Sequence, residues 1–219
     1  MLTDTARESG EAVIVVHGLW LHGWVFTRLR NRLRRRGLDA HTFSYPSMGR
    51  GFAQNVAALA RFASSVKGGR VHLVGHSLGG LICLRYAAQS PDPRLSRIVL
   101  LGSPVKGSSV AAQLAKGPLG KWLLGSAWRE LAHGIAARLP PHIEVGVIAG
   151  NVGLGLGRLA ATIAGPHDGT VTVEETRMEG AADALLLRTT HTGLIFSARA
   201  AQQVACFLAK GKFDRSQDP

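Results

Sequence analysis

Short apolar segments alternate with longer amphipathic segments along most of this chain. Several of the apolar segments contain runs such as VIVV and IVLL, in which hydrophobic residues follow one another without a polar break. Such runs are typical of strands that are covered on both faces, as in a parallel sheet. We therefore predict strands at residues 12–17, 39–45, 71–75, 97–101, 143–149 and 184–190.

The segments between these strands have the spacing of helices. Strands that alternate with helices indicate an α/β fold in which right-handed crossovers join the parallel strands. No repeat or linker divides the chain, so we expect a single domain at residues 12–210 between polar tails at 1–11 and 211–219. The helices are predicted at residues 24–36, 52–66, 78–89, roughly 109–139, and 194–208.

Two stretches interrupt this alternation. Residues 105–142 form the longest connection and are punctuated by glycine and proline, and residues 151–157 read NVGLGLG. Glycines at this density weaken regular elements. We therefore consider 105–142 and 151–165 as segments that cover a substrate, although helices packed on the sheet would explain 105–142 equally well.

The composition agrees with a folded domain. The chain has 219 residues, of which 46% are hydrophobic and 18% charged, so it can bury one sizeable core and is not disordered. Its two cysteines, Cys83 and Cys206, fall in predicted helices and are too few for a small disulfide scaffold. Because the N-terminus is polar and no run approaches the roughly 18 apolar residues of a membrane span, we expect a cytoplasmic protein.

Basic residues outnumber acidic ones by 26 to 14, and the densest basic block lies at residues 28–36. No aromatic side chain interleaves this block, so it offers no platform for stacking bases, and we do not expect a nucleic-acid partner. The block is either an ordinary solvated helix face or a weak contact for an anionic membrane surface. Its members are Arg28, Arg30, Arg32, Arg34, Arg35 and Arg36.

The sequence GHSLGG at residues 75–80 carries the strongest chemical signal. It matches the G-x-S-x-G pattern, and it lies between a predicted strand and a predicted helix, as that pattern requires. The tight turn places Ser77 at the carboxyl end of the sheet, where its hydroxyl is free to act as a nucleophile. The helix that begins at Leu78 points its unpaired N–H groups toward the same place.

A serine nucleophile needs a base, and His191 is the best candidate. It follows the last predicted strand and therefore lies at the same end of the sheet as Ser77. The other downstream histidines fit less well, because His133 lies within a predicted helix, His142 precedes a strand, and His167 adjoins a candidate acid.

The base in turn needs an acid to orient it, and we assign this role to Asp168. It lies in the sequence GPHDGTV, after the strand at 143–149 and 23 residues before His191. Asp183 is a rival, but it starts the last strand and so belongs at the opposite end of the sheet. Glu174 and Glu175 fit less well, on what looks like a short helix.

The strand at 12–17 runs directly into the sequence HGLW. The backbone N–H groups of Leu19 and Leu78 are expected to form an oxyanion hole, which stabilises the charge that develops on a carbonyl oxygen. His17 is expected to fix this loop by hydrogen bonds, and His76 is expected to be a packing residue.

These segments together resemble the α/β-hydrolase superfamily, and more narrowly its small, lidless bacterial lipases and esterases. HGLW resembles the oxyanion segment, GHSLGG the nucleophile elbow, LLGSPVKGS the stretch after the next strand, HDGTV the acid box and HTGLIFS the histidine segment. The resemblance spans residues 13–207. It implies an α/β-hydrolase fold with a mostly parallel sheet of about six strands, helices on both faces and no large cap domain. Ser103 and Lys106 depart from the pattern, where threonine and histidine are commoner.

The resemblance implies the same triad of Ser77, Asp168 and His191, with Leu19 and Leu78 as oxyanion donors. The expected function is hydrolysis of a lipophilic carboxylic ester of short to medium chain. An acyltransferase with the same triad, or a non-catalytic binding protein of this fold, are the alternatives. No metal and no other cofactor is expected, and the sequence does not indicate an oligomeric state. Candidate substrate-binding residues are Trp20, His22, Trp122, Leu124 and Trp128.

Overall fold

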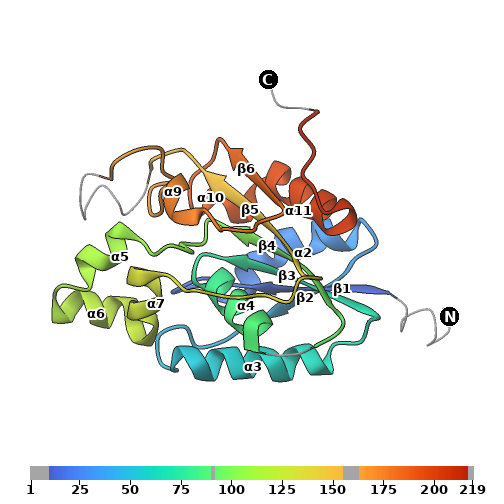
Figure 1. Ribbon diagram of the computed structural model, residues 1–219, viewed down its shortest axis with the longest axis horizontal. Coiled ribbons are helices and arrows are strands. Elements are labelled where there is room, and N and C mark those ends of the chain that lie inside the picture. Colours follow the sequence, from blue (N-terminus) through green and yellow to red (C-terminus); the bar gives the residue numbers. More distant parts are fainter. Residues whose placement is uncertain (1–9, 90–91, 155–162, 217–219) are drawn as a thin grey trace.

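The computed structural model describes residues 10–89, 92–154 and 163–216, and these form an α/β fold around one sheet (Figure 1). The sheet has six strands in the order β2-β1-β3-β4-β5-β6, and every neighbouring pair is parallel. All six predicted strands are therefore confirmed. Their bounds are β1 (Glu11–Val16), β2 (Asp39–Phe43), β3 (Arg70–His76), β4 (Leu95–Leu101), β5 (Glu144–Gly150) and β6 (Asp183–Leu187).

Helices cover both faces of the sheet, as the fold class predicts. One face packs against α3 (Phe52–Ser65) and α4 (Leu78–Gln89). The other packs against α2 (Thr27–Arg34), α10 (Gly193–Phe196) and α11 (Ala198–Lys210). The remaining short elements are the 3-10 turns η1 (Gly23–Phe26) and η2 (Gly125–Ala127), and the helices α5 (Ser109–Leu114), α6 (Pro118–Leu124), α7 (Trp128–His133) and α9 (Val173–Thr176).

The continuous apolar runs of the strands fill two hydrophobic layers, one on each face of the sheet. In β1, Ile14 and Val16 face α3 and α4, whereas Val13 and Val15 face α2 and α11. All four side chains are fully buried. This explains why these strands show no alternation of apolar and polar residues.

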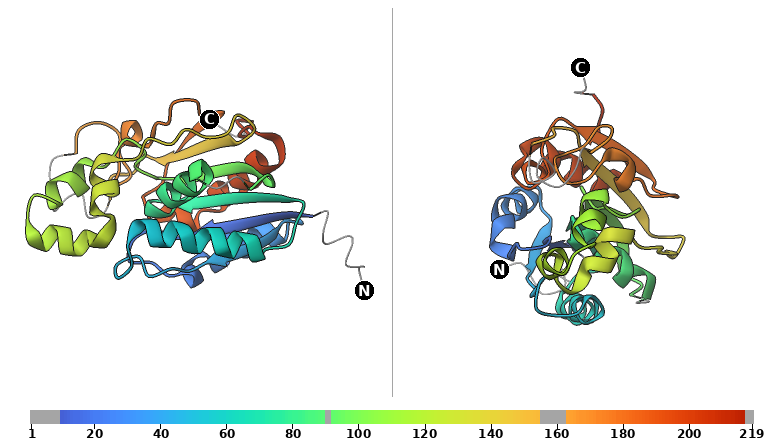
Figure 2. Two further views of the ribbon diagram at one scale, coloured as in Figure 1. Left: turned by 60° about the horizontal axis from the view of Figure 1, so that its bottom comes forward. Right: turned by 90° about the vertical axis from the view of Figure 1, so that its left-hand side faces the viewer.

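The prediction of one helical stretch over 109–139 is wrong. Three short helices, α5, α6 and α7, replace it, and Figures 1 and 2 show them as a group beyond the carboxyl ends of the strands. Pro118 starts α6 in the first-turn position that proline favours. Gly125 and Gly134, which end α6 and α7, have φ values of 63° and 73°, and glycine adopts this conformation without steric cost.

The packed part of the chain extends past the predicted boundary at residue 210. Phe213 is buried and its ring lies 5.0 Å from that of Phe207, and Arg215 forms an ion pair with Asp183. Of the predicted tails, residues 1–9 and 217–219 lie outside the described part, as do residues 155–162 of the second covering segment. No helix in the described ranges is both long and apolar enough to cross a bilayer.

Candidate active site

The turn between β3 and α4 places Ser77 in a strained backbone conformation. Its φ is 53°, a value that side-chain-bearing residues rarely adopt. The turn is possible because its neighbours are glycines. A Cβ on Gly75 would overlap the backbone of Gly80, and one on Gly79 would overlap the carbonyl oxygens of Val16 and His17. Strain of this kind is characteristic of functional sites.

Asp168 is held by the loop that follows β5, and only 1% of its surface is exposed. Its Oδ1 accepts hydrogen bonds from the backbone N–H groups of Thr170 and Val171, at 3.0 and 2.8 Å. Its Oδ2 lies 2.7 Å from Nδ1 of His191. The loop therefore fixes the carboxylate so that one oxygen is free to bind the imidazole.

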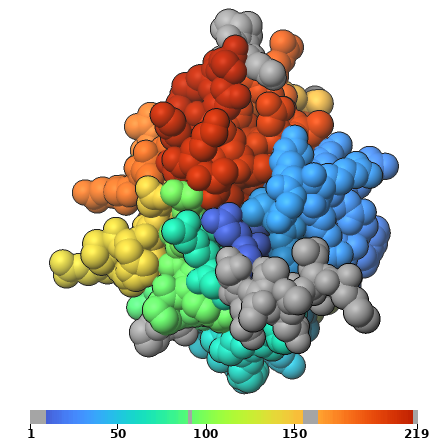
Figure 3. All heavy atoms as spheres, turned by 90° about the vertical axis from the view of Figure 1, so that its right-hand side faces the viewer, coloured from blue at the N-terminus to red at the C-terminus, as the bar shows by residue number. Residues whose placement is uncertain are grey.

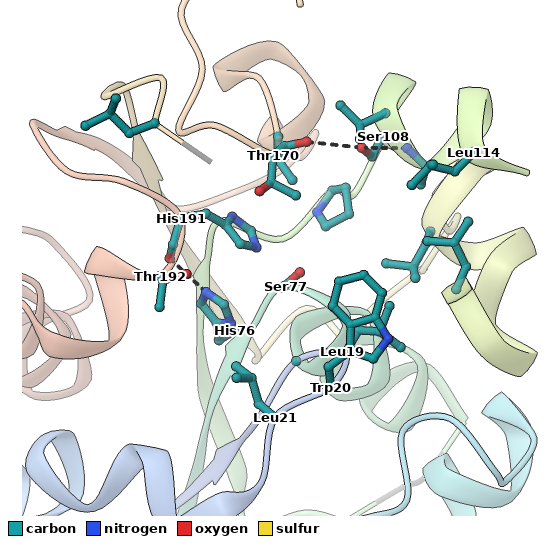
Figure 4. Close-up of a pocket in the computed structure, with 18 residues that line it drawn as sticks. Leu19, Trp20, Leu21, His76, Ser77, Ser108, Leu114, Thr170, His191 and Thr192 are labelled. Atoms are coloured by element: carbon teal, nitrogen blue, oxygen red, sulfur yellow. Dashed lines mark hydrogen bonds between the residues drawn. The ribbon is translucent and has the colours of Figure 1, made fainter. Parts of the chain in front are cut away.

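His191 receives a second contact from the same residue, because its backbone N–H donates to the carbonyl oxygen of Asp168 at 2.8 Å. With Nδ1 donating its proton to the carboxylate, Nε2 is left as the acceptor nitrogen. Figure 4 shows the His191 ring and the Ser77 hydroxyl pointing into the same cavity. The base predicted from the sequence thus lies beside the predicted nucleophile and is oriented by the predicted acid.

The loop after β1 is anchored by His17, which is fully buried. Its Nδ1 donates to the carbonyl oxygen of Gly18 at 2.8 Å, and its Nε2 accepts the backbone N–H of Tyr45 at 3.1 Å. The Tyr45 hydroxyl donates to the carbonyl oxygen of His17, and the two rings stack with centroids 4.2 Å apart. Burial lowers the pKa of His17, so the ring is neutral, as both of its hydrogen bonds require.

This loop presents the backbone N–H of Leu19, which donates to no acceptor among the described residues. The next N–H, that of Trp20, is occupied by the hydroxyl oxygen of Ser47 at 3.1 Å. Leu78 is the first residue of α4, so its N–H has no partner within the helix. Both N–H groups predicted for the oxyanion hole are therefore left without an intrahelical or loop acceptor.

His76 forms a hydrogen bond with His191 in addition to packing against it. Its Nε2 donates to the backbone carbonyl oxygen of His191 at 3.0 Å, and the two rings lie 4.7 Å apart. Burial, together with the neighbouring His191, lowers the pKa of His76 to about 3. A neutral His76 therefore supports His191 from below, a contact that sequence reasoning missed.

These groups surround a cavity of about 260 Å³ whose wall is mostly apolar. Ser77, His76 and His191 lie at one end, and the other walls come from the β1 loop, from α5 to α7 and from the Asp168 loop (Figure 4). Within the described residues, no three side chains of the metal-binding types converge on a common point. The apolar residues of the wall are Leu19, Trp20, Leu21, Pro104, Val110, Ala111, Leu114, Leu124, Leu131, Leu154 and Val171.

Residues 13–209 match the model of the alpha/beta hydrolase family. The chain belongs to this family. Among curated proteins, the chain is similar to pimeloyl-acyl-carrier-protein methyl ester esterase from Chromobacterium violaceum, with 37% identity over 103 residues. This alignment covers 43% of this chain and 38% of the esterase. The chain is also 34% identical over 122 residues to N-formylmaleamate deformylase from Pseudomonas putida, and this alignment covers 50% of this chain and 43% of the deformylase. The match thus spans about two fifths of the length of these relatives.

Solved structures of other proteins share the fold over most of the chain. The mature form of Bacillus licheniformis lipase BlEst2 aligns with a TM-score of 0.67 at 18% identity, over 93% of this chain and 91% of that one. The metagenomic carboxyl esterase MGS0156 aligns with a TM-score of 0.64 at 21% identity, over 84% of this chain and 65% of the esterase chain. The alpha/beta hydrolase fold predicted from the sequence is therefore confirmed.

Of the predicted substrate-binding residues of this alpha/beta hydrolase, Trp20 and Leu124 line the cavity, but the other three do not. Trp122 is 68% exposed on the outer side of α6, because Leu124 takes the inward position. Trp128, the first residue of α7, packs on the core, with Nζ of Lys121 4.8 Å from the centre of its ring. His22 is exposed at the start of η1.

The carboxylates considered as rivals to Asp168 have structural partners elsewhere. Asp183 begins β6 at the opposite end of the sheet, as predicted, and binds Arg215 and the backbone N–H of Phe213. Glu174 pairs with Lys106 and Arg177, and Glu175 caps α9. These interactions leave Asp168 as the carboxylate that contacts His191.

The rival histidines also lie apart from the cavity wall. His133 ends α7, and His142 is exposed in the turn before β5. His167 accepts the backbone N–H of Gly169 and so shapes the Asp168 loop.

Three polar residues of the cavity wall, Ser108, Thr170 and Thr192, were not predicted. Ser108 caps α5 and donates its hydroxyl proton to the carbonyl oxygen of Thr170 at 3.3 Å. This hydrogen bond joins the segment after β4 to the Asp168 loop. The sequence signal was a serine directly before a helix, which is typical of an N-cap and does not by itself indicate a cavity.

Proposed function

We propose that this protein is a serine hydrolase that cleaves carboxylic esters through an acyl-enzyme on Ser77. The observation that carries the proposal is the 2.7 Å contact between Asp168 and His191, which leaves Nε2 of His191 to face a cavity shared with a strained serine. The esterase and deformylase names of the curated relatives support an acyl-cleaving reaction.

In the proposed reaction, the Ser77 hydroxyl oxygen attacks the ester carbonyl carbon while Nε2 of His191 takes the hydroxyl proton. The carbonyl oxygen becomes negatively charged and binds the N–H groups of Leu19 and Leu78. His191 then gives its proton to the alcohol oxygen, and the C–O bond breaks. Water attacks the acyl-enzyme with His191 again as the base, which releases the acid and restores Ser77.

Asp168 keeps its charge throughout this cycle in the proposed mechanism. Its Oδ2 stabilises the imidazolium that forms when His191 takes the proton, and the N–H groups of Thr170 and Val171 hold its other oxygen in place. The hydrogen bond from the His191 backbone N–H to the carbonyl oxygen of the same residue holds the main chains of the two loops together.

The cavity favours a small lipophilic acyl group. A volume of about 260 Å³ is below the roughly 300–1,000 Å³ of pockets that enclose drug-sized ligands. No aspartate, glutamate, lysine or arginine is found among the described residues that line it. We therefore propose esters with a short to medium apolar acyl chain as substrates.

A series of nitrophenyl esters of graded chain length, assayed with wild type and Ser77→Ala, tests this function. Ser77→Ala should lower kcat by about 10⁴- to 10⁶-fold. A matched control is Ser108→Ala, which removes another hydroxyl from the same cavity and should keep turnover within about tenfold of wild type. A fluorophosphonate should label the peptide that contains Ser77 in wild type. The proposal fails if Ser77→Ala keeps a tenth of wild-type turnover, or if folded wild type hydrolyses no ester of the series.

A further inference from the structure

Helix α2 and the turn after it carry a dense group of arginines without acidic partners. None of the six arginines between residues 28 and 36 forms an ion pair with a carboxylate that the structure describes. Arg32 and Arg34 instead donate to the backbone carbonyl oxygens of Phe196 and Ala40, at 2.7 and 2.9 Å. Arg28 is exposed in the first turn of α2, close to the carboxyl end of β1, whereas the exposed Arg35 and Arg36 follow α2 and precede the amino end of β2.

The surrounding sequence does not neutralise this charge. Residues 12–38 and 184–213 supply α2, α10 and α11, and together they contain ten basic residues and no aspartate or glutamate. In Figure 3 the surface of residues 23–43 (blue) adjoins that of α11 (red). These two stretches of the chain therefore carry an excess of positive charge, which attracts an anionic surface.

Exposed aromatic side chains adjoin the arginines. Trp24 is 75% exposed and Phe196 is 42% exposed, and with Val25, Thr27 and Arg28 they line an open hollow. Trp24 belongs to η1, directly after the loop that presents Leu19, and Phe196 ends α10, which begins two residues after His191. The hollow thus lies next to the candidate active site. We name Trp24, Phe196 and Arg28 the basic shoulder.

The other side of the cavity mouth has the same combination of groups. Leu119 and Trp122 of α6 are 69% and 68% exposed, and the exposed Lys116 and Lys121 lie beside them in the sequence. Nε1 of Trp20, on the cavity wall, donates to the carbonyl oxygen of Leu123, so α6 borders the mouth directly. Apolar groups with neighbouring cations thus lie on both sides of the opening.

We propose that the protein docks on an anionic lipid surface through the basic shoulder and α6, with the cavity mouth between them. Tryptophan side chains are favoured at the membrane–water interface, and arginine and lysine are attracted to anionic lipid headgroups. Paired apolar patches flanking one opening suit a flat, extended partner that contacts both at once. An acidic protein would need to span the same opening, and it would close the route by which a lipophilic ester enters.

Vesicle flotation with the full chain tests the proposal. The wild type should bind vesicles that contain phosphatidylserine, should ignore vesicles of phosphatidylcholine alone, and should be released by high salt. Each exposed arginine or lysine near the surface contributes about fivefold in affinity. The triple variant Arg28→Gln, Lys116→Gln, Lys121→Gln should therefore bind anionic vesicles about 100-fold more weakly.

A control with the same net charge removes basic residues from the opposite layer. Arg61→Gln, Lys67→Gln, Arg85→Gln changes α3, the turn after it and α4. This variant should keep affinity for vesicles within about twofold of wild type because these elements pack on the other face of the sheet from the basic shoulder. Trp24→Ala should also weaken binding. In all of these variants, the turnover of a water-soluble short-chain ester should stay at the wild-type value, which separates this proposal from the proposed reaction.

Three results would overturn the proposal. Equal loss of binding in the two triple variants would mean that net charge alone drives adsorption. Equal binding of wild type to neutral and anionic vesicles would remove the role of the arginines. Failure to bind any vesicle at low salt would exclude a lipid surface, and binding of soluble polyglutamate that the Arg28, Lys116 and Lys121 triple variant loses would then assign the basic shoulder to an acidic protein instead.

Discussion

The strained backbone at Ser77 predicts that two substitutions with the same effect on activity have different effects on stability. A side-chain-bearing residue with φ of 53° costs about 1–3 kcal/mol, and glycine removes this cost. Glycine also loses more backbone entropy on folding, which offsets about 0.5–1 kcal/mol of the gain. Ser77→Gly should therefore be more stable than Ser77→Ala by about 1 kcal/mol, although both should be inactive.

Urea unfolding and calorimetry of the two variants measure this difference. In a chain of this size, about 1 kcal/mol corresponds to a rise in Tm of roughly 2–4 °C. Ser64, which is exposed in helix α3, provides a control in which the sign reverses. There, Ser64→Gly should be less stable than Ser64→Ala by about 1 kcal/mol, because glycine weakens a helix.

The result that would refute this reasoning is equally specific. If Ser77→Gly were less stable than Ser77→Ala, as at Ser64, the positive φ at Ser77 would store no strain. The glycines around the turn would then be needed only because a Cβ would overlap the neighbouring backbone, and not because the turn is strained.

The remaining predictions concern the acid and the response to low pH. Asp168→Asn should lower kcat by about 10⁴-fold because the amide favours the wrong imidazole tautomer, whereas Asp183→Asn should leave kcat of the ester assay unchanged. His72 lies in β3 with both ring nitrogens lacking a hydrogen-bond partner among the described residues, and burial lowers its pKa to about 4. Between pH 7 and 5 the unfolded chain gains a proton that the folded chain excludes, so the free energy of unfolding should fall by about 2 kcal/mol on this account. Urea unfolding at pH 7 and pH 5 measures this change in the free energy of unfolding. The decrease on going to pH 5 should be smaller in His72→Leu than in wild type by about 2 kcal/mol. His142→Leu, at an exposed position, is the control and should show the same decrease as wild type.

The sheet was predictable because burial on both faces leaves a direct trace in the sequence. Runs such as VIVV in β1 admit few interpretations other than a covered strand, and α4 begins and ends where predicted. The region at 109–139 was harder, since its short helices pack on one another and on the cavity rather than on the sheet. Their ends depend on the backbone conformation of Gly125 and Gly134, and a glycine in a sequence does not reveal its φ.

The candidate site divides in the same way. Ser77, Asp168 and His191 could be placed because each follows a strand, and the carboxyl ends of parallel strands meet at one edge of the sheet. The pocket residues could not be placed, because α6 alone decides that Leu124 faces inward while Trp122 faces solvent. The contact between His76 and the His191 carbonyl joins residues 115 positions apart, and no local pattern encodes it.

The strand order has a consequence for how the chain is made. From β3 onward, each new strand adds to the same edge of the sheet, in the order in which a ribosome would deliver it. The β3–α4 turn can therefore form early, with β1 and β4 on either side, while the imidazole of His191 arrives only after β6. Until the last strand docks, a nascent chain holds the serine without its base. In the proposed mechanism it would therefore be chemically silent during synthesis, and its activity would report that the whole sheet has been assembled.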